Sequence, residues 1–163
     1  RENDTEHSYN LAMTAWFLAP HFPELDRDVL IRYALVHDLV EVHAGDTYIY
    51  GSPEELESKR DRERAAAEKL AAEWADFPDI HDLIRSYEAR DTAEARFVYA
   101  LDKIMPLLLI YNHNGYTWKK RGITVAQLHA VKAKKVALSP EILPYYTQLH
   151  ALLFNSPHLI KPQ

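Results

Sequence analysis

Hydrophobic positions along this chain follow a helical period, and short polar breaks divide them into segments. Apolar residues recur every three or four positions, the spacing that gathers them on one face of an α-helix. Alternating runs typical of β-strands are missing, and the chain has only 4 glycines. The pattern therefore predicts an all-α fold, a helical bundle of about six or seven helices. The expected helices cover residues 5–19, 28–42, 54–74, 80–89, 93–112, 124–138 and 140–153.

The expected helix over residues 28–42 is apolar on almost every face, which is typical of a helix at the centre of a domain. Its C-terminal end nevertheless carries His37, Asp38 and Glu41. Because positions three and four apart share a helix face, Glu41 should lie over His37 and Asp38. Burying such groups is costly without a partner, and a divalent cation would supply one. The alternative is that Asp38 and Glu41 are solvated while His37 is hydrogen-bonded in the core.

Gly45 and Asp46 follow this segment directly. A glycine commonly ends a helix, and the turn can direct Asp46 back toward the same point. The loop continues through Tyr48 and Tyr50, which either line a substrate pocket or simply pack against the protein.

Two further polar residues stand at informative positions, His7 in the first turn of the first helix and Asp102 within the helix over residues 93–112. A single histidine at a helix start is often just exposed to solvent. The helical neighbours of Asp102 are apolar, so its carboxylate needs a partner to stay ionised. That partner could be a metal or, in a plain salt bridge, Arg96 or Lys103.

Four candidate metal ligands result from this pattern: His7, His37, Asp38 and Asp102. Two imidazoles and two carboxylates suit one divalent ion such as Mn, Co, Ni, Zn or Fe. Mg prefers oxygen ligands and its own waters, and is less expected here. Because these residues do not close the coordination shell, positions stay open for water and substrate, which is typical of a catalytic site.

Length, charge and composition limit the kinds of binding partner that we expect for this protein. The 163 residues are enough for one domain, and we treat residues 1–163 as a single domain. A net charge of −5 argues against a nucleic-acid polymer as partner. The longest apolar stretch, residues 104–111, is far short of the about 20 residues of a membrane span, so we expect no membrane partner. The chain has no cysteine and no visible signal peptide, which fits a cytoplasmic location.

A small basic cluster at residues 118–122, expected to be a loop, includes Lys119. Lys119 could hold a phosphate group, although three adjacent basic residues on a loop are more often simply solvated.

The ordered set of motifs resembles the HD-domain superfamily of metal-dependent phosphohydrolases, and within it the 5′-deoxynucleotidase-like branch. The resemblance runs from Arg1 to about Asp102 and weakens afterwards. It is carried by Glu6-His7-Ser8, His37-Asp38-Leu39-Val40-Glu41, Gly45-Asp46 and Ala100-Leu101-Asp102-Lys103.

This resemblance implies a helical HD domain around one divalent metal, with His7, His37, Asp38 and Asp102 as ligands. It implies that Glu41 and Asp46 lie beside the attacking water and the scissile phosphate. It also implies a phosphate-binding arginine upstream of the first histidine, which Arg1 could match. We expect a further N-terminal helix to precede Arg1, and a homodimer, since relatives often form one.

The function expected from these features is that of a phosphomonoesterase that removes the 5′-phosphate from (deoxy)nucleoside monophosphates. Glu41 and Asp46 would be its catalytic residues, and Arg1 or Lys119 would clamp the substrate phosphate. One alternative is another HD-type nucleotide hydrolase, either a phosphodiesterase or a pyrophosphohydrolase. The other is a non-catalytic module in which a metal or a nucleotide stabilises a dimer.

Overall fold

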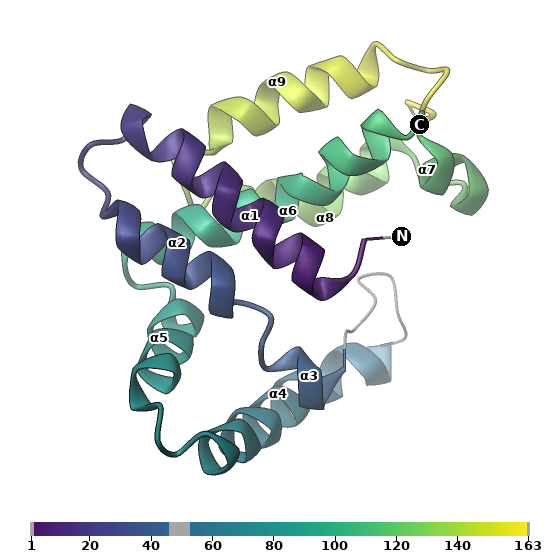
Figure 1. The fold of residues 1–163 in the computed structure, drawn as a ribbon. Helices are drawn as coiled ribbons and strands as arrows, with labels where there is room; N and C mark the ends of the chain where they lie inside the picture. The colour runs from purple at the N-terminus through teal and green to yellow at the C-terminus, as the bar shows by residue number, and fades with distance from the viewer. Residues whose placement is uncertain (1, 46–52, 163) are drawn as a thin grey trace.

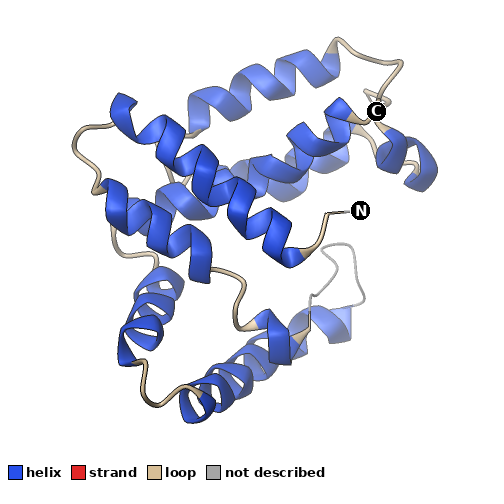
Figure 2. Cartoon of the chain, in the orientation of Figure 1, coloured by secondary structure: helices blue, strands red, loops and turns tan. Residues whose placement is uncertain are grey.

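Residues 2–45 and 53–162 are described by the computed structural model, without the side chains of residues 53–57, 59 and 60. These residues form helices joined by short turns, and no strand is present among them (Figure 2). The predicted all-α fold is therefore confirmed. In chain order the elements are α1 (Asp4–Leu18), the 3₁₀ helix η1 (Ala19–His21), α2 (Arg27–Val36), α3 (Glu41–Ala44), α4 (Pro53–Glu73), α5 (Pro78–Ala89), α6 (Ala93–Asn112), α7 (Tyr116–Arg121), α8 (Val125–Val136) and α9 (Leu143–Phe154).

Helix α6 is the central element. It packs against α1, α2, α5, α7 and α8, and it runs behind α1 in Figure 1. Phe97, Ala100, Leu101 and Ile104 on α6 are almost fully buried in the main hydrophobic core. Burial of this kind stabilises the fold by about 1.5–3 kcal/mol for each large apolar side chain. A polar group at the middle of α6 is therefore held on a rigid support.

The helix expected over residues 28–42 is shorter than predicted, because α2 ends at Val36 and residues 37–40 form a turn. In a continuing helix, the carbonyl of Ala34 would accept from the amide of Asp38. Here the Nδ1 of His37 lies 2.9 Å from that carbonyl oxygen and takes this acceptor. Tighter backbone hydrogen bonds follow, such as the one from the amide of Leu39 to the carbonyl of Val36. Glu41 therefore begins α3 and does not continue the face of α2.

A second, smaller hydrophobic cluster anchors both ends of this turn. Val36 and Val40 are buried there against Leu70 of α4 and against Ile80 and Ile84 of α5. His37 and Asp38 lie between the two valines in sequence, at the boundary between the main core and this second cluster. Packing on both sides thus sets the backbone position of these two residues.

Residues 118–122, expected as a loop, are mostly helical, since α7 extends from Tyr116 to Arg121. Glycines with left-handed backbone conformation precede and follow it, Gly115 with φ 65° and Gly122 with φ 64°. The described residues contain more α-helices than the six or seven predicted, because α3 and α7 are short helices that the sequence pattern did not separate.

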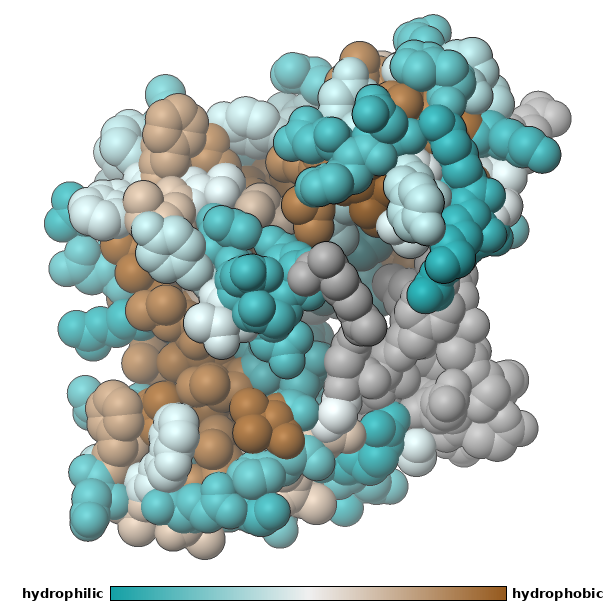
Figure 3. Space-filling view, turned by 45° about the vertical axis from the view of Figure 1, so that its right-hand side comes forward, coloured by the Kyte–Doolittle hydropathy of each residue, from teal (hydrophilic) through white to brown (hydrophobic). Residues whose placement is uncertain are grey.

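Several large hydrophobic side chains stay exposed on the surface. On α1 they are Tyr9, Met13, Trp16 and Phe17, which are 44–75% exposed. Figure 3 shows one face of the molecule, where exposed hydrophobic side chains form a continuous patch with hydrophilic side chains around it. Within the part of the chain that the structure describes, none of the helices has both the length and the apolar character needed to cross a bilayer.

Candidate functional site

His7, His37 and Asp102 meet although they come from α1, the end of α2 and the middle of α6. One side-chain ligand atom from each lies within 4.8 Å of the others. The Nε2 of His7 is 3.0 Å from the Oδ1 of Asp102, and the Nε2 of His37 is 3.9 Å from the same oxygen. Three of the four ligands predicted from sequence thus form one cluster.

Asp38, the fourth predicted ligand, approaches the same nitrogen. Its Oδ2 lies 2.9 Å from the Nε2 of His37. That nitrogen is buried and has no partner in hydrogen-bonding geometry among the described residues. The two side chains are therefore close enough to form an ion pair when His37 is protonated. Asp38 thus lies close to His37, although it is not part of the group of three residues whose ligand atoms all lie within 4.8 Å of one another.

Hydrogen bonds on the opposite side of each ring orient both imidazoles. The Nδ1 of His37 donates to the carbonyl of Ala34, since a carbonyl oxygen can only accept. The Nδ1 of His7 donates to the carboxylate of Glu2 at 3.3 Å. An imidazole fixed at Nδ1 in this way presents Nε2 to a metal, and carboxylate or carbonyl partners of this type are common behind metal-bound histidines.

The local helix start explains how His7 reaches this position. Asn3 caps α1: its side chain accepts from the amide of Glu6, whose carboxylate accepts from the amide of Asn3 in return. This reciprocal cap fixes the first turn of the helix. His7 is in that turn and faces α6, so the cap also fixes the position of a candidate ligand.

Asp102 is buried, yet its partners keep it ionised. Burial alone would raise its pKa, but the Lys103 ammonium and the two histidines lower it well below the usual range. Lys103 donates to the Oδ2 of Asp102, so the salt bridge considered from sequence exists beside the histidine contacts. The pKa of His7 is raised to about 9, first by its hydrogen bond to Asp102. Burial opposes protonation of His37, but Asp38 and then Asp102 outweigh it and raise the pKa of this histidine.

The arrangement fits a divalent cation. Two atoms that each lie about 2.1 Å from one ion are roughly 3 Å apart at a right angle and about 4.2 Å apart on opposite sides. The separations of 3.0 Å, 2.9 Å and 3.9 Å in this cluster lie within that range. The buried Nε2 of His37 lies close to two carboxylates but makes no hydrogen bond in good geometry, which is consistent with a site for a cation.

A cavity of about 120 Å³ adjoins the cluster. Glu41 lines it beside His37, Asp38 and Asp102. The other polar residues on its wall come from α4, α5, α6 and α8: Glu63, Tyr87, Glu88, Arg90, Tyr99, Lys103 and Lys135. The cavity wall thus combines carboxylate side chains, which can bind a metal ion, with cationic side chains, which can bind an anionic substrate.

Other predicted site residues are not brought to this cavity. Lys119 is exposed on α7 and is not among the residues that line the cavity. Arg1 and Asp46 lie outside the described residues, as do Tyr48 and Tyr50.

Sequence reasoning missed Glu2, Tyr99 and Arg90, all of which contact or line this site. Glu2 stands five residues before His7, and that proximity to the first ligand was a usable signal. Arg90 had no comparable signal, because it reaches the site only through the turn between α5 and α6.

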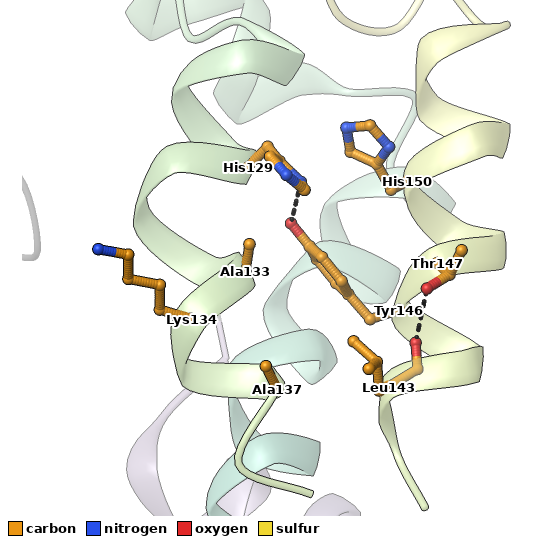
Figure 4. A pocket seen from close by; sticks show the side chains of 8 residues that line it. All are labelled: His129, Ala133, Lys134, Ala137, Leu143, Tyr146, Thr147 and His150. Atoms are coloured by element: carbon orange, nitrogen blue, oxygen red, sulfur yellow. Dashed lines mark hydrogen bonds between the residues drawn. The ribbon is translucent and has the colours of Figure 1, made fainter. Parts of the chain in front are cut away.

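A larger cavity of about 340 Å³ lies between α8 and α9 (Figure 4). The hydroxyl of Tyr146 lies 3.2 Å from the Nδ1 of His129, and the rings of His129 and His150 are 4.5 Å apart. The residues that line it include no carboxylate and none of the predicted site residues. The smaller cavity beside His37 is therefore the candidate functional site.

Comparison with known proteins finds 5′-deoxynucleotidases among the relatives of this chain. The chain is 35% identical over 112 residues to the 5′-deoxynucleotidase HDDC2 of Xenopus laevis, a match that covers 66% of this chain and 53% of that protein. It is 29% identical to the 5′-deoxynucleotidase HDDC2 of Homo sapiens, with 66% and 52% covered. The chain thus spans about half the length of the curated relatives it matches.

A solved structure resembles nearly the whole chain. It is the crystal structure of a predicted metal-dependent phosphohydrolase from Magnetospirillum magnetotacticum MS-1, with a TM-score of 0.80 and 34% identity. The match covers 98% of this chain and 83% of that one. The profile of the HD domain family matches residues 1–143, which include every described residue of the candidate site. This protein therefore belongs to the HD domain family.

Proposed function

We propose that this protein is a metal-dependent phosphohydrolase that removes the 5′-phosphate from (deoxy)nucleoside monophosphates. The observation that carries the proposal is the convergence of His7, His37 and Asp102 beside a cavity lined by Glu41 and by cationic side chains. The curated relatives are 5′-deoxynucleotidases and the structural relative is a predicted metal-dependent phosphohydrolase, which supports the same reaction class.

The proposed metal ligands are His7, His37, Asp38 and Asp102. The imidazole nitrogens favour Mn, Co, Ni, Zn or Fe over Mg, which prefers oxygen ligands. A divalent cation held by these residues would supply Lewis-acid chemistry, since such an ion lowers the pKa of water and draws charge from a phosphoryl oxygen.

Glu41 is proposed as the group that orients the attacking water and accepts its proton. A positioned carboxylate of this kind contributes typically 10²–10⁴-fold to the rate. As the water oxygen bonds to phosphorus, the bond from phosphorus to the 5′-oxygen breaks, and that oxygen takes up a proton. Asp46 is proposed beside the leaving oxygen, and Arg1 near the phosphate. Lys119 stays a prediction, although its exposed place on α7 gives it no contact with the cavity.

The test is phosphate release by metal-stripped protein. Mn, Co, Ni, Zn and Mg are added back singly, and a panel of mono-, di- and cyclic nucleotides is offered. Metal-dependent release from monophosphates, absent in Asp102→Ala, is the expected result. Release only from diesters or diphosphates would favour the alternative hydrolase classes. Bound metal with no release from any nucleotide would contradict the proposal and favour a non-catalytic module.

We further propose that residues 1–163 form a single HD domain in a cytoplasmic protein that associates as a homodimer. The exposed stripe of Tyr9, Met13, Trp16 and Phe17 on α1 supports association, because apolar patches of this kind are common at interfaces. Light scattering after size exclusion should give a dimer for the wild type and a monomer for Phe17→Glu. The control Phe154→Glu changes an exposed phenylalanine on α9 and should stay dimeric. A monomeric wild type would contradict the proposed homodimer.

The proposed cytoplasmic location is tested by cell fractionation.

A further inference from the structure

Arg90 has a backbone conformation that its residue type does not favour. It ends α5 in the left-handed region, with φ 54° and ψ 27°. Helices commonly end this way at glycine, and sometimes at asparagine, because a Cβ is strained there. Among the described residues, Asn114 is the other non-glycine residue with positive φ, and asparagine tolerates it. An arginine held in a strained turn beside an active site points to a role for its side chain.

Neighbouring residues keep both the turn and the side chain of Arg90 in place. The guanidinium of Arg96 donates to the carbonyl oxygens of Arg90 and Asp91, at 3.1 Å and 2.8 Å. The guanidinium carbon of Arg90 lies 4.2 Å from the centre of the Tyr99 ring. Tyr99 stands three residues before Asp102 on α6, so the ring that contacts Arg90 shares a helix face with a candidate metal ligand.

The donors of Arg90 are only partly used. Its Nη2 donates to Glu88 at 3.2 Å, whereas its Nε is buried and has no hydrogen-bond partner. Lys103, another cation on the cavity wall, is already committed to Asp102 and lies 4.9 Å from the Tyr99 ring centre. Arg90 thus lines the cavity that also contains candidate metal ligands, and the donors of its guanidinium are not all used.

We propose that Arg90 binds the phosphate group of the substrate and that Tyr99 is a positioning residue for its guanidinium. A planar guanidinium can donate two parallel hydrogen bonds to phosphate, which a lysine cannot reproduce. Stacking on an aromatic ring restricts the guanidinium without using its donors. This inference rests on the proposed function, since it assigns the phosphate subsite of the same cavity.

The experiment measures binding of inorganic phosphate, the reaction product, to Co²⁺-loaded protein by calorimetry, and in parallel kcat and KM for deoxynucleoside monophosphates. Arg90→Gly is the informative variant, because it removes the guanidinium while glycine relieves the left-handed backbone. Arg90→Lys and Tyr99→Leu complete the series. Arg85→Gln is the matched control, since Arg85 is an exposed arginine on α5 that pairs with Asp82 and does not line the cavity.

Arg90→Gly should weaken phosphate binding at least 30-fold and raise KM similarly. Its Co²⁺ affinity should stay within threefold of wild type and its Tm within about 3 °C. Arg90→Lys should recover only part of the affinity, and Tyr99→Leu should lose about tenfold. Arg85→Gln should match wild type. A residue that served only the structure would instead lower Tm and leave phosphate affinity unchanged.

Phosphate affinity within twofold of wild type in Arg90→Gly overturns the inference, as does a Co²⁺-loaded wild type that binds no phosphate. The two proposals fail separately. If the wild type hydrolyses nucleotides while Arg90→Gly behaves like wild type, only the phosphate assignment is wrong. If phosphate binding depends on Arg90 but no nucleotide is hydrolysed, the phosphate assignment holds and the proposed reaction is wrong.

Discussion

His7 and Asp102 are 95 residues apart in sequence, yet the Nε2 of His7 lies 3.0 Å from the Oδ1 of Asp102. This contact joins the first turn of α1 to the middle of α6. Without a bound cation it is a charged hydrogen bond, because the pKa of His7 is raised and that of Asp102 is lowered. The same atoms would both bind a cation, so metal binding must replace a proton held between them.

Removal of Asp102 should abolish stabilisation by metal. A ligand present at 100 times its Kd stabilises the folded state by about 2.7 kcal/mol, which corresponds to roughly 5–10 °C in Tm for a domain of this size. We expect Mn²⁺ or Co²⁺ to raise the Tm of wild type by this amount and to leave that of Asp102→Asn unchanged. Scanning calorimetry with and without chelator measures both. Asp61→Asn, an exposed carboxylate on α4, should respond like wild type.

The metal-free protein should lose stability as the pH rises. The pKa of His7 is about 9 in the folded state against an ordinary value of 6.5, so its contribution is complete below pH 6.5 and is lost as pH rises through 9. The loss amounts to at most about 3 kcal/mol. Urea unfolding at pH 6.5, 7.5 and 9 measures it. His7→Asn should give a flatter profile, and an equally steep one would show that another group is responsible.

Metal affinity should rise with pH between about pH 6.5 and 9, where the stability of the metal-free protein should fall. Because the cation must displace the proton on the Nε2 of His7, affinity should rise about tenfold per pH unit while one proton is released. The shifted pKa of His37 adds to this dependence. Titration of Co²⁺ by its absorption at pH 6.5, 7.5 and 8.5 is the measurement. A pH-independent Kd would mean that neither imidazole binds the ion.

Glu41→Gln should separate metal binding from turnover. Glu41 lines the cavity but is not part of the ligand cluster, so the variant should bind Co²⁺ within threefold of wild type. Loss of the proton acceptor should lower kcat by about 10²–10⁴. Glu24→Gln, an exposed carboxylate before α2, is the control and should keep full activity. Unchanged turnover in Glu41→Gln would remove this residue from the mechanism.

The cluster of His7, His37 and Asp102 could be predicted because residue type and helical period can both be read from the local sequence. His37 and Asp102 each interrupt an apolar helical pattern, and a buried polar group in such a place needs a partner. The break after Val36 was not predictable in the same way, because it depends on the hydrogen bond from His37 to the carbonyl of Ala34. Propensity favoured a continuous helix, whereas in the structure this side-chain hydrogen bond and the packing of Val36 and Val40 accompany a break.

Arg90 shows the limit of local reasoning more clearly. Its relevance depends on a left-handed turn, on the hydrogen bonds from Arg96 and on stacking over Tyr99. None of these contacts has a periodic signature in the sequence. The basic residues at 118–122 offered a stronger sequence signal, but the fold places them on α7, outside the cavity.

Two glycines with the same backbone conformation should respond very differently to alanine. Gly115 and Gly122 have φ of 65° and 64°. A Cβ added at Gly115 would overlap the carbonyl group of Leu159, 2.8 Å from its carbon, whereas nothing lies within 4 Å of one added at Gly122. Gly122→Ala should therefore cost only the backbone strain, about 1 kcal/mol. Gly115→Ala should cost about 3 kcal/mol or more, because the C-terminal segment must move away from α7 as well. Urea unfolding of both variants measures the difference, and equal losses would mean that the contact between Gly115 and Leu159 does not hold that segment in place.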